Sequence, residues 1–361
     1  MNERLIPMTK QPSEPLRNSA ASAVRLAGFT AESAEVRRGW CLRFCAVLCA
    51  LGAIPAFAQP AWEQLPPLPE PNGGFVCGLN QGKIIVVGGT NWEGGKKNWF
   101  DSVHAYDLQR NTWAKNTARH SSPVAYAAGV QVFETLTIVG GTNGQHALRY
   151  PFIVGDGGTI GIGVQNLPDR LILTTGGDVK GKILVVGGTA DPVTFEGISN
   201  ATYAVVSGDP WSVVRLADYP GKPFATAASA VVGEELFVFG GMNYDAEAKL
   251  PVNTAEAYAF SPEKNVWRKL TPLAAPTRGL TAVTLDENHI YIAGGYREDF
   301  TAEAVIYDVK ADSYRKAVPL PYAAMVGLVK MGDHVYCLGG EDKKQSRTDK
   351  FFRIPVAELL K

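Results

Sequence analysis

The sequence predicts an all-β protein, a six-bladed β-propeller closed by an N-terminal outer strand that completes the last blade. Three observations indicate this fold. The chain repeats itself, each repeat has the pattern of four short strands, and each end of the repeated region lacks what the other end supplies. In every repeat an apolar strand ends in a Gly-Gly pair, and the pairs stand at residues 88–89, 140–141, 187–188, 240–241, 294–295 and 339–340.

The fourth unit shows the order of the strands most plainly. A strand of small residues, Ala228–Val232, precedes the apolar strand that ends at 240–241, and two more strands follow at Ala255–Phe260 and Asn265–Leu270. Short strands with turn residues between them form an antiparallel sheet. Because such a sheet cannot bury both faces alone, we expect the sheets to stack around an axis with large aromatic side chains between neighbours.

The two ends of the repeated region complement each other. After the last Gly-Gly pair only one clear strand follows, Thr348–Ile354, whereas a strand with a Trp, Ala61–Pro69, precedes the first complete unit. We therefore expect these two segments to pair, so that the N-terminal strand becomes the outermost member of the last blade.

The first 58 residues read as a leader and residues 59–361 as the propeller. An apolar run over Phe44–Ile54 follows two arginines and precedes Ala56-Phe57-Ala58, which is the pattern of a secretory signal peptide. The run is too short to span a bilayer, so we expect cleavage near Ala58 and a periplasmic or secreted protein. A translation start nearer the run, such as Val36, would give a leader of ordinary length.

The composition excludes some partners and leaves the thiols open. Lys and Arg number 35 and Asp and Glu also number 35, so no net charge favours nucleic acid or a membrane surface. A monomer or a homodimer would both fit. Export would permit Cys77 and Cys337 to form a disulfide, and two separate buried thiols are the alternative.

The loops after the Gly-Gly strands and those between blades open on one face, where a propeller usually binds its ligand. They carry aromatic, amide, basic and acidic side chains, which are the groups that a sugar pocket uses. The expected substrate-binding residues of these loops are Asn91, Asn143, Arg278, Arg297 and Tyr322. The five histidines are scattered over different units without ligand spacing, so we expect neither a metal nor another cofactor.

Two motifs carry a resemblance to known families. The Gly-Gly pairs, the Tyr-Asp and Trp of Val103–Trp113 and the spacing resemble the Kelch repeat. In the last unit, G-E-x-K-x-x-x-R-T-D resembles the signature loop of the sialic acid mutarotases, also called N-acetylneuraminate epimerases, which are periplasmic Kelch propellers. The resemblance implies that Glu341 is catalytic and that Arg347 is the loop's arginine.

Two departures from that family are visible. The loop lies in the last unit rather than a middle one, as in a cyclically permuted branch, and Lys344-Gln345 replaces the usual Pro-Gly turn. The implied reaction is interconversion of the anomers of N-acetylneuraminate. Glu341 would remove the anomeric proton, Lys343 or a water would protonate the ring oxygen, and Arg347 would bind the sugar's carboxylate. A Kelch module that binds a glycan or a protein without catalysis is the alternative.

Overall fold

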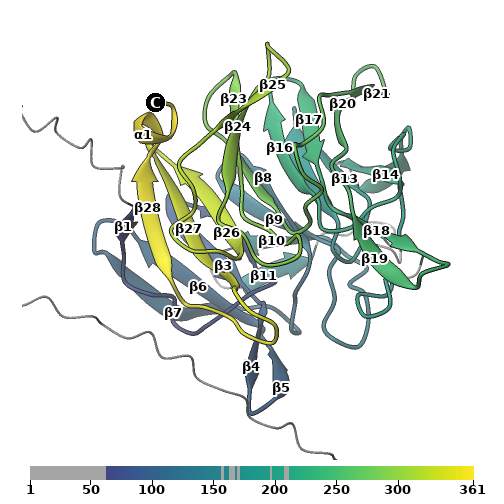
Figure 1. Ribbon diagram of the computed structural model, residues 1–361. Coiled ribbons are helices and arrows are strands. Elements are labelled where there is room, and N and C mark those ends of the chain that lie inside the picture. The colour runs from purple at the N-terminus through teal and green to yellow at the C-terminus, as the bar shows by residue number, and fades with distance from the viewer. Residues whose placement is uncertain (1–61, 156–157, 162–166, 169–170, 196, 207–210) are drawn as a thin grey trace, which may run out of the picture. The chain divides into compact units, whose positions relative to one another are not determined.

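Six four-stranded antiparallel sheets make up the protein and form the blades of a β-propeller (Figure 1). A computed structural model describes residues 62–361 except 156–157, 162–166, 169–170, 196 and 207–210. The leader predicted over residues 1–58 and its cleavage site lie outside the described residues. No helix in the part of the chain that the structure describes is long and apolar enough to cross a membrane.

Each blade is a meander whose strands are numbered outward from the axis. The first three blades are β2 (Val76–Asn80), β3 (Lys83–Val87), β6 (Ser102–Asp107) and β7 (Thr112–Arg119); β8 (Ala128–Val132), β9 (Thr135–Val139), β10 (Phe152–Gly155) and β11 (Gly158–Gly161); and β12 (Thr175–Val179), β13 (Lys182–Val186), β14 (Thr202–Val206) and β15 (Ser212–Arg215).

The last three blades follow the same plan. They are β16 (Ala228–Val232), β17 (Glu235–Phe239), β20 (Ala257–Ser261) and β21 (Val266–Lys269); β22 (Thr281–Thr284), β23 (His289–Ala293), β24 (Ala304–Asp308) and β25 (Ser313–Lys316); and β26 (Met325–Met331), β27 (His334–Glu341), β28 (Phe351–Pro355) and β1 (Glu63–Gln64). Two hairpins, β4 (Thr90–Glu93) with β5 (Lys96–Trp99) and β18 (Met242–Asp245) with β19 (Leu250–Asn253), extend from the first and fourth blades.

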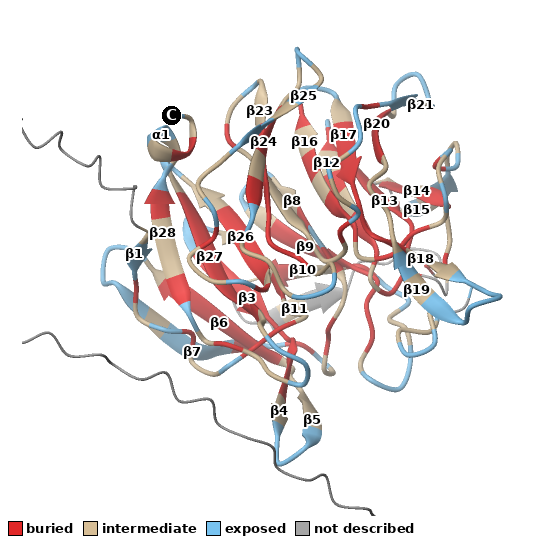
Figure 2. Cartoon of the chain, in the orientation of Figure 1, coloured by how far each residue is buried: buried red, intermediate tan, exposed pale blue. Residues whose placement is uncertain are grey.

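The innermost strands form a closed ring, because they contact one another in the order β2, β8, β12, β16, β22, β26 and back to β2. The predicted small-residue strand of the fourth unit is β16, with the bounds expected from the sequence. Burial falls from the second strand to the outermost one: β17 is buried over four of its five residues, whereas β21 has no buried residue (Figure 2). This gradient is what sheets stacked around an axis require.

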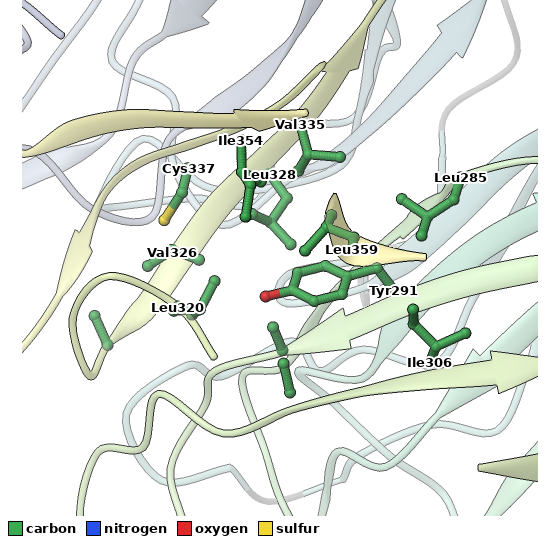
Figure 3. Close-up of a cluster of buried hydrophobic side chains, with 13 residues drawn as sticks. Leu285, Tyr291, Ile306, Leu320, Val326, Leu328, Val335, Cys337, Ile354 and Leu359 are labelled. Atoms are coloured by element: carbon green, nitrogen blue, oxygen red, sulfur yellow. The ribbon is translucent and has the colours of Figure 1, made fainter. Parts of the chain in front are cut away.

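Large aromatic side chains fill the seams between blades, as predicted. Tyr106 of β6 packs edge-on against Phe351 of β28, with ring centroids 4.8 Å apart, and Trp113 of β7 lies 5.2 Å from the same ring. On the other side of the last blade, Leu359 of helix α1 (Val356–Leu359) joins Tyr291 of β23 in the buried cluster shown in Figure 3. The last blade is therefore packed on both faces.

The ends of the chain close the ring as the sequence predicts. Strand β1 pairs with β28 through Glu63 opposite Arg353, and it is the outermost strand of the last blade. The indole of Trp62 donates a hydrogen bond of 2.8 Å to the carbonyl of Pro319. The indoles of Trp113 and Trp267 bind carbonyls of the connection before their own blades in the same way, so the N-terminal segment replaces a fourth strand of the repeat.

The Gly-Gly pairs turn the chain where each second strand reaches the axis. In the last blade Gly339 and Gly340 have φ of 52° and 107°, in the left-handed region that favours glycine. A Cβ on Gly340 would lie 2.1 Å from the carbonyl oxygen of Met325. The pair thus permits a close approach of backbones and sets the direction of the residue that follows it.

Both cysteines of the propeller are free thiols, which answers the question that the sequence left open. Cys77 lies on β2 and Cys337 is buried on β27. Burial raises the pKa of Cys337 to about 12. This thiol therefore behaves as a small apolar side chain in the packing of the last blade.

Candidate active site

A cavity of about 820 Å³ lies where the residues that follow the Gly-Gly pairs come together. The six residues at this position are Thr90, Thr142, Thr189, Met242, Tyr296 and Glu341. Thr142, Met242, Tyr296 and Glu341 line the cavity, which also receives side chains from the loops between blades. Only the last unit places a charge here, and Thr90, Thr142, Thr189 and Met242 are buried.

Glu341 forms an ion pair with an arginine from its own loop. Its Oε1 lies 3.2 Å from a terminal nitrogen of Arg347, and its side chain is 32% exposed whereas that of Arg347 is 4% exposed. The same nitrogen of Arg347 donates a 2.8 Å hydrogen bond to the carbonyl of Ser346, and the buried Nε has no partner among the described residues. Arg347 therefore holds the carboxylate from behind and does not line the cavity.

The loop between β27 and β28 is a tight turn, although Lys344-Gln345 replaces Pro-Gly. Gln345 adopts a φ of 56°, the left-handed conformation that a glycine would take without strain. The amide of Ser346 donates to the carbonyl of Lys343 at 3.1 Å, and the hydroxyl of Ser346 donates to Asp342 at 2.9 Å. These bonds keep Arg347 under Glu341 and turn Lys344 to the cavity wall.

Arg278 brings a second guanidinium to the same cavity. Its charged carbon lies 4.4 Å from the ring centroid of Tyr296, and a terminal nitrogen donates a 3.0 Å hydrogen bond to Oδ1 of Asn253. Burial lowers the pKa of Arg278 below its ordinary value, while the charges of Tyr296 and Glu341 act in the opposite direction. Arg278 is thus oriented by a ring and an amide and has no carboxylate partner within ion-pair distance among the described side chains.

Of the eight residues predicted to form the site, the structure brings Glu341 and Arg278 together on the cavity wall, with Arg347 behind Glu341. Lys343 is exposed on the outer side of its loop. The hydroxyl of Tyr322 donates a 2.9 Å hydrogen bond to the carbonyl of Gly339, so it supports the turn before Glu341 from below.

Three other predicted residues do not line this cavity. Asn91 is buried on β4 and its Oδ1 accepts a 2.9 Å hydrogen bond from Asn98. The side chain of Asn143 caps its own loop by accepting hydrogen bonds from the amides of residues 145 and 146. Arg297 pairs with Glu303 at 2.8 Å and lines a neighbouring hollow of about 730 Å³ that also touches Arg278.

Several lining residues were not singled out from the sequence. The most polar are Lys97, Tyr126, His146, Asp191 and Lys344, and Trp99, Phe195 and Phe300 add aromatic faces. Lys97 and Trp99 stand in a predicted loop, but nothing in that loop alone distinguishes them. Tyr126 could be found by aligning the units, because it precedes a small-residue strand where the other units have Gly74, Leu173, Thr226 and Gly279. No cluster that could hold a metal ion occurs among the described His, Cys, Asp and Glu residues.

Comparison with known proteins gives two kinds of relative. Residues 164–317 match the N-acetylneuraminate epimerase family and residues 71–115 match the Kelch motif. The chain is 26% identical over 176 residues to N-acetylneuraminate epimerase of Salmonella enteritidis, covering 38% of this chain and 46% of that protein. It is 28% identical over 178 residues to the Salmonella typhimurium protein of the same name, again covering 38% and 46%.

The second kind of relative is not named as an enzyme. Kelch-like protein 35 of Mus musculus is 29% identical over 176 residues, which are 48% of this chain and 28% of that protein. The chain thus spans less than half the length of the curated relatives it matches. The epimerase family match ends at residue 317, before the loop that carries Glu341 and Arg347.

Proposed function

Because this Kelch-repeat β-propeller is related to the N-acetylneuraminate epimerases over residues 164–317, we propose that it is a sugar mutarotase that interconverts the anomers of N-acetylneuraminate. The observation that carries the proposal is the carboxylate of Glu341. It stands on the wall of the cavity at a position where no other unit has a charge, and Arg347 fixes it from behind.

The cavity suits a sugar acid. Its volume lies within the range of small-molecule sites, and its wall alternates aromatic faces with polar groups. A sugar's apolar ring faces pack on aromatic rings, and its hydroxyls need hydrogen-bonding partners. Arg278 offers a planar guanidinium to the substrate carboxylate, because its hydrogen bond to Asn253 leaves other N–H groups available. In this proposal Arg278 binds the carboxylate and Arg347 positions the base.

Glu341 would act as the general base. It takes the proton of the anomeric hydroxyl, the bond from the anomeric carbon to the ring oxygen breaks with its electron pair, and the ring oxygen takes a proton from an acid. Rotation about the exposed carbonyl bond and the reverse steps then give the other anomer. An ionised carboxylate is required for the first step, and the adjacent guanidinium of Arg347 favours that state.

We further propose that the protein acts in the periplasm or outside the cell. The basis is the signal-like pattern that ends near Ala58. Sequencing the N-terminus of the protein recovered from the periplasmic or culture fraction tests this. An uncleaved product confined to the cytoplasm contradicts it.

A non-catalytic Kelch module is the second candidate, and the match to Kelch-like protein 35 favours it. The two candidates differ in one measurement, exchange between the two anomers of N-acetylneuraminate followed by proton NMR at fixed pH. A mutarotase raises the exchange rate in proportion to the protein concentration, above the rate in buffer. Sugar binding without any acceleration of exchange would reject the enzyme and support the binding module.

A further inference from the structure

Tyr126 lines the same cavity as Glu341, and both lie beside Arg347. We propose that the Tyr126 phenol is the second proton-transfer group of the site, giving a proton to the ring oxygen as the sugar opens and taking it back as the ring closes. This inference rests on the proposed function. It replaces Lys343, which is exposed on the outer side of its loop, as the acid.

The backbone holds Tyr126 in a strained conformation that points to a positioned side chain. Its φ is 60°, in the left-handed region that bulky residues rarely adopt. Its amide donates a 2.8 Å hydrogen bond to the carbonyl of Gly74 in the previous blade, and its carbonyl accepts one of 2.8 Å from Leu173 in the next. The residue is therefore fixed from both sides by the ring of blades.

Two consecutive glycines make room for the pair of side chains at this point. A Cβ on Gly74 would lie 2.4 Å from a ring carbon of Tyr126, and a Cβ on Gly73 would lie 2.3 Å from Cδ of Arg347. The tyrosine ring and the arginine therefore rest on adjacent residues of one chain segment. Since Arg347 contacts Glu341 at 3.2 Å, this segment joins the proposed base and the proposed acid in one cluster.

The hairpin β4–β5 completes the surroundings of the phenol. The ammonium of Lys97 lies 4.7 Å from the ring centroid of Tyr126 and 4.6 Å from that of Trp99, and the two rings meet edge to face at 5.9 Å. The hydroxyl of Tyr126 lies 3.5 Å from the hydroxyl of Thr90. The charges that act on the phenol, those of Lys97 and Arg347, are both positive.

These cations favour the deprotonated phenol. Burial raises the pKa of Tyr126, but the charge and hydrogen bond of Lys97, the hydroxyl of Thr90 and the charge of Arg347 outweigh that effect, so the pKa falls below its ordinary value of 10. A phenol with a lowered pKa is a better proton donor to a departing ring oxygen. The tyrosinate left behind is stabilised by Lys97 until the ring closes.

The proton transfers balance over the cycle. Glu341 accepts the proton of the anomeric hydroxyl while Tyr126 gives its own to the ring oxygen, and the anomeric C–O ring bond becomes a carbonyl and a hydroxyl. On closure that hydroxyl returns its proton to tyrosinate and attacks the other face of the carbonyl, whose oxygen takes the proton from Glu341. Both residues end in their initial states, and no other reactant is needed.

The test is the exchange rate of Tyr126→Phe, with Tyr150→Phe as the matched control because Tyr150 is exposed and outside the cavity. We expect Tyr126→Phe to lower catalysed exchange by roughly 10²- to 10⁴-fold while binding of N-acetylneuraminate changes little. Tyr150→Phe should keep the full rate. If Tyr126→Phe weakens binding but preserves the maximal rate, Tyr126 only contacts the sugar and the inference is wrong.

A second variant reads the role through pH. The protonated phenol is the active form for ring opening, so catalysed exchange should fall as pH rises through its pKa. Lys97→Met removes the nearest positive charge, which raises that pKa and moves the decline to higher pH. Lys96→Met, on the same hairpin but outside the cavity, should leave the decline in place. An unmoved decline in Lys97→Met contradicts the inference.

The outcomes separate this inference from the proposed function. Exchange that is lost in Glu341→Gln but retained in Tyr126→Phe overturns the role of Tyr126 and leaves the mutarotase intact. Absence of exchange in the unmodified protein overturns both.

Discussion

At the scale of the residue, one repeated position shows how the fold makes a site. Thr90 follows its Gly-Gly pair and satisfies its hydroxyl with the carbonyl of Gly73 at 3.1 Å. Glu341 stands at the same position in the last unit and cannot be satisfied in that way, because a carboxylate only accepts hydrogen bonds. It requires the guanidinium of Arg347 instead. A charge that departs from the pattern of its repeat, together with a buried partner, is typical of a functional site.

Arg278 gives the first prediction at this scale. Arg278→Lys should weaken binding of N-acetylneuraminate by about 10- to 150-fold, equivalent to about 1.5–3 kcal/mol, because an ammonium cannot reproduce the planar fork toward a carboxylate. Titration of the sugar into the purified variant measures this.

Two controls accompany that measurement. Arg268→Lys alters an arginine that pairs with Glu235 on the outer strands, away from the cavity, and should not change the affinity. A neutral sugar should bind the unmodified protein and Arg278→Lys equally. Equal loss of affinity for neutral and acidic sugars would mean that Arg278 does not read the carboxylate.

At the scale of the element, β1 is short but its connections are strong. Only Glu63 and Gln64 pair with β28, yet the amides of Leu65 and Leu68 donate 2.8 Å hydrogen bonds to the carbonyls of Phe351 and Asp349. Leu65 and Leu68 are both buried. The N-terminal segment thus covers an edge of the last blade that would otherwise expose unpaired backbone groups.

Removal of residues 59–68 from the mature protein should therefore destabilise the ring. The two buried leucines alone are worth about 3–6 kcal/mol, at about 1.5–3 kcal/mol for each side chain. Thermal unfolding should show a lower Tm and increased aggregation of the shortened protein. Glu63→Gln, which alters only an exposed partner of Arg353, should cost about 1 kcal/mol at most. Equal Tm values for the shortened and full proteins would show that β1 is not needed for closure.

At the scale of the whole molecule, the repeat made the fold predictable. The Gly-Gly pairs, the strand order of a unit and the unmatched end strands each follow from local sequence, and the ring contacts and the β1–β28 pairing agree with them. A ring of equivalent blades also brings the same position of every unit to one end of the axis. Glu341 could be singled out because it departs from that repeated position.

The rest of the site could not be read from the sequence, because it depends on contacts between blades. Lys97 meets Tyr126 across two blades, and no single repeat displays that contact. Asn91 and Asn143 were expected to reach a substrate, but short amides in loops readily satisfy neighbouring backbone and side-chain groups. Arg347 was expected to face the substrate, and the tight turn through Gln345 places it behind Glu341.

The central claim is that Glu341 removes a proton from the sugar, and Glu341→Gln tests it most directly. Glutamine keeps the shape and hydrogen-bonding capacity of the side chain but cannot act as the base. NMR exchange between the anomers of N-acetylneuraminate, with Tm and sugar affinity recorded in parallel, should show a loss of catalysed exchange of roughly 10²- to 10⁴-fold in a folded, sugar-binding protein. Full catalysed exchange in a folded Glu341→Gln protein would contradict the account.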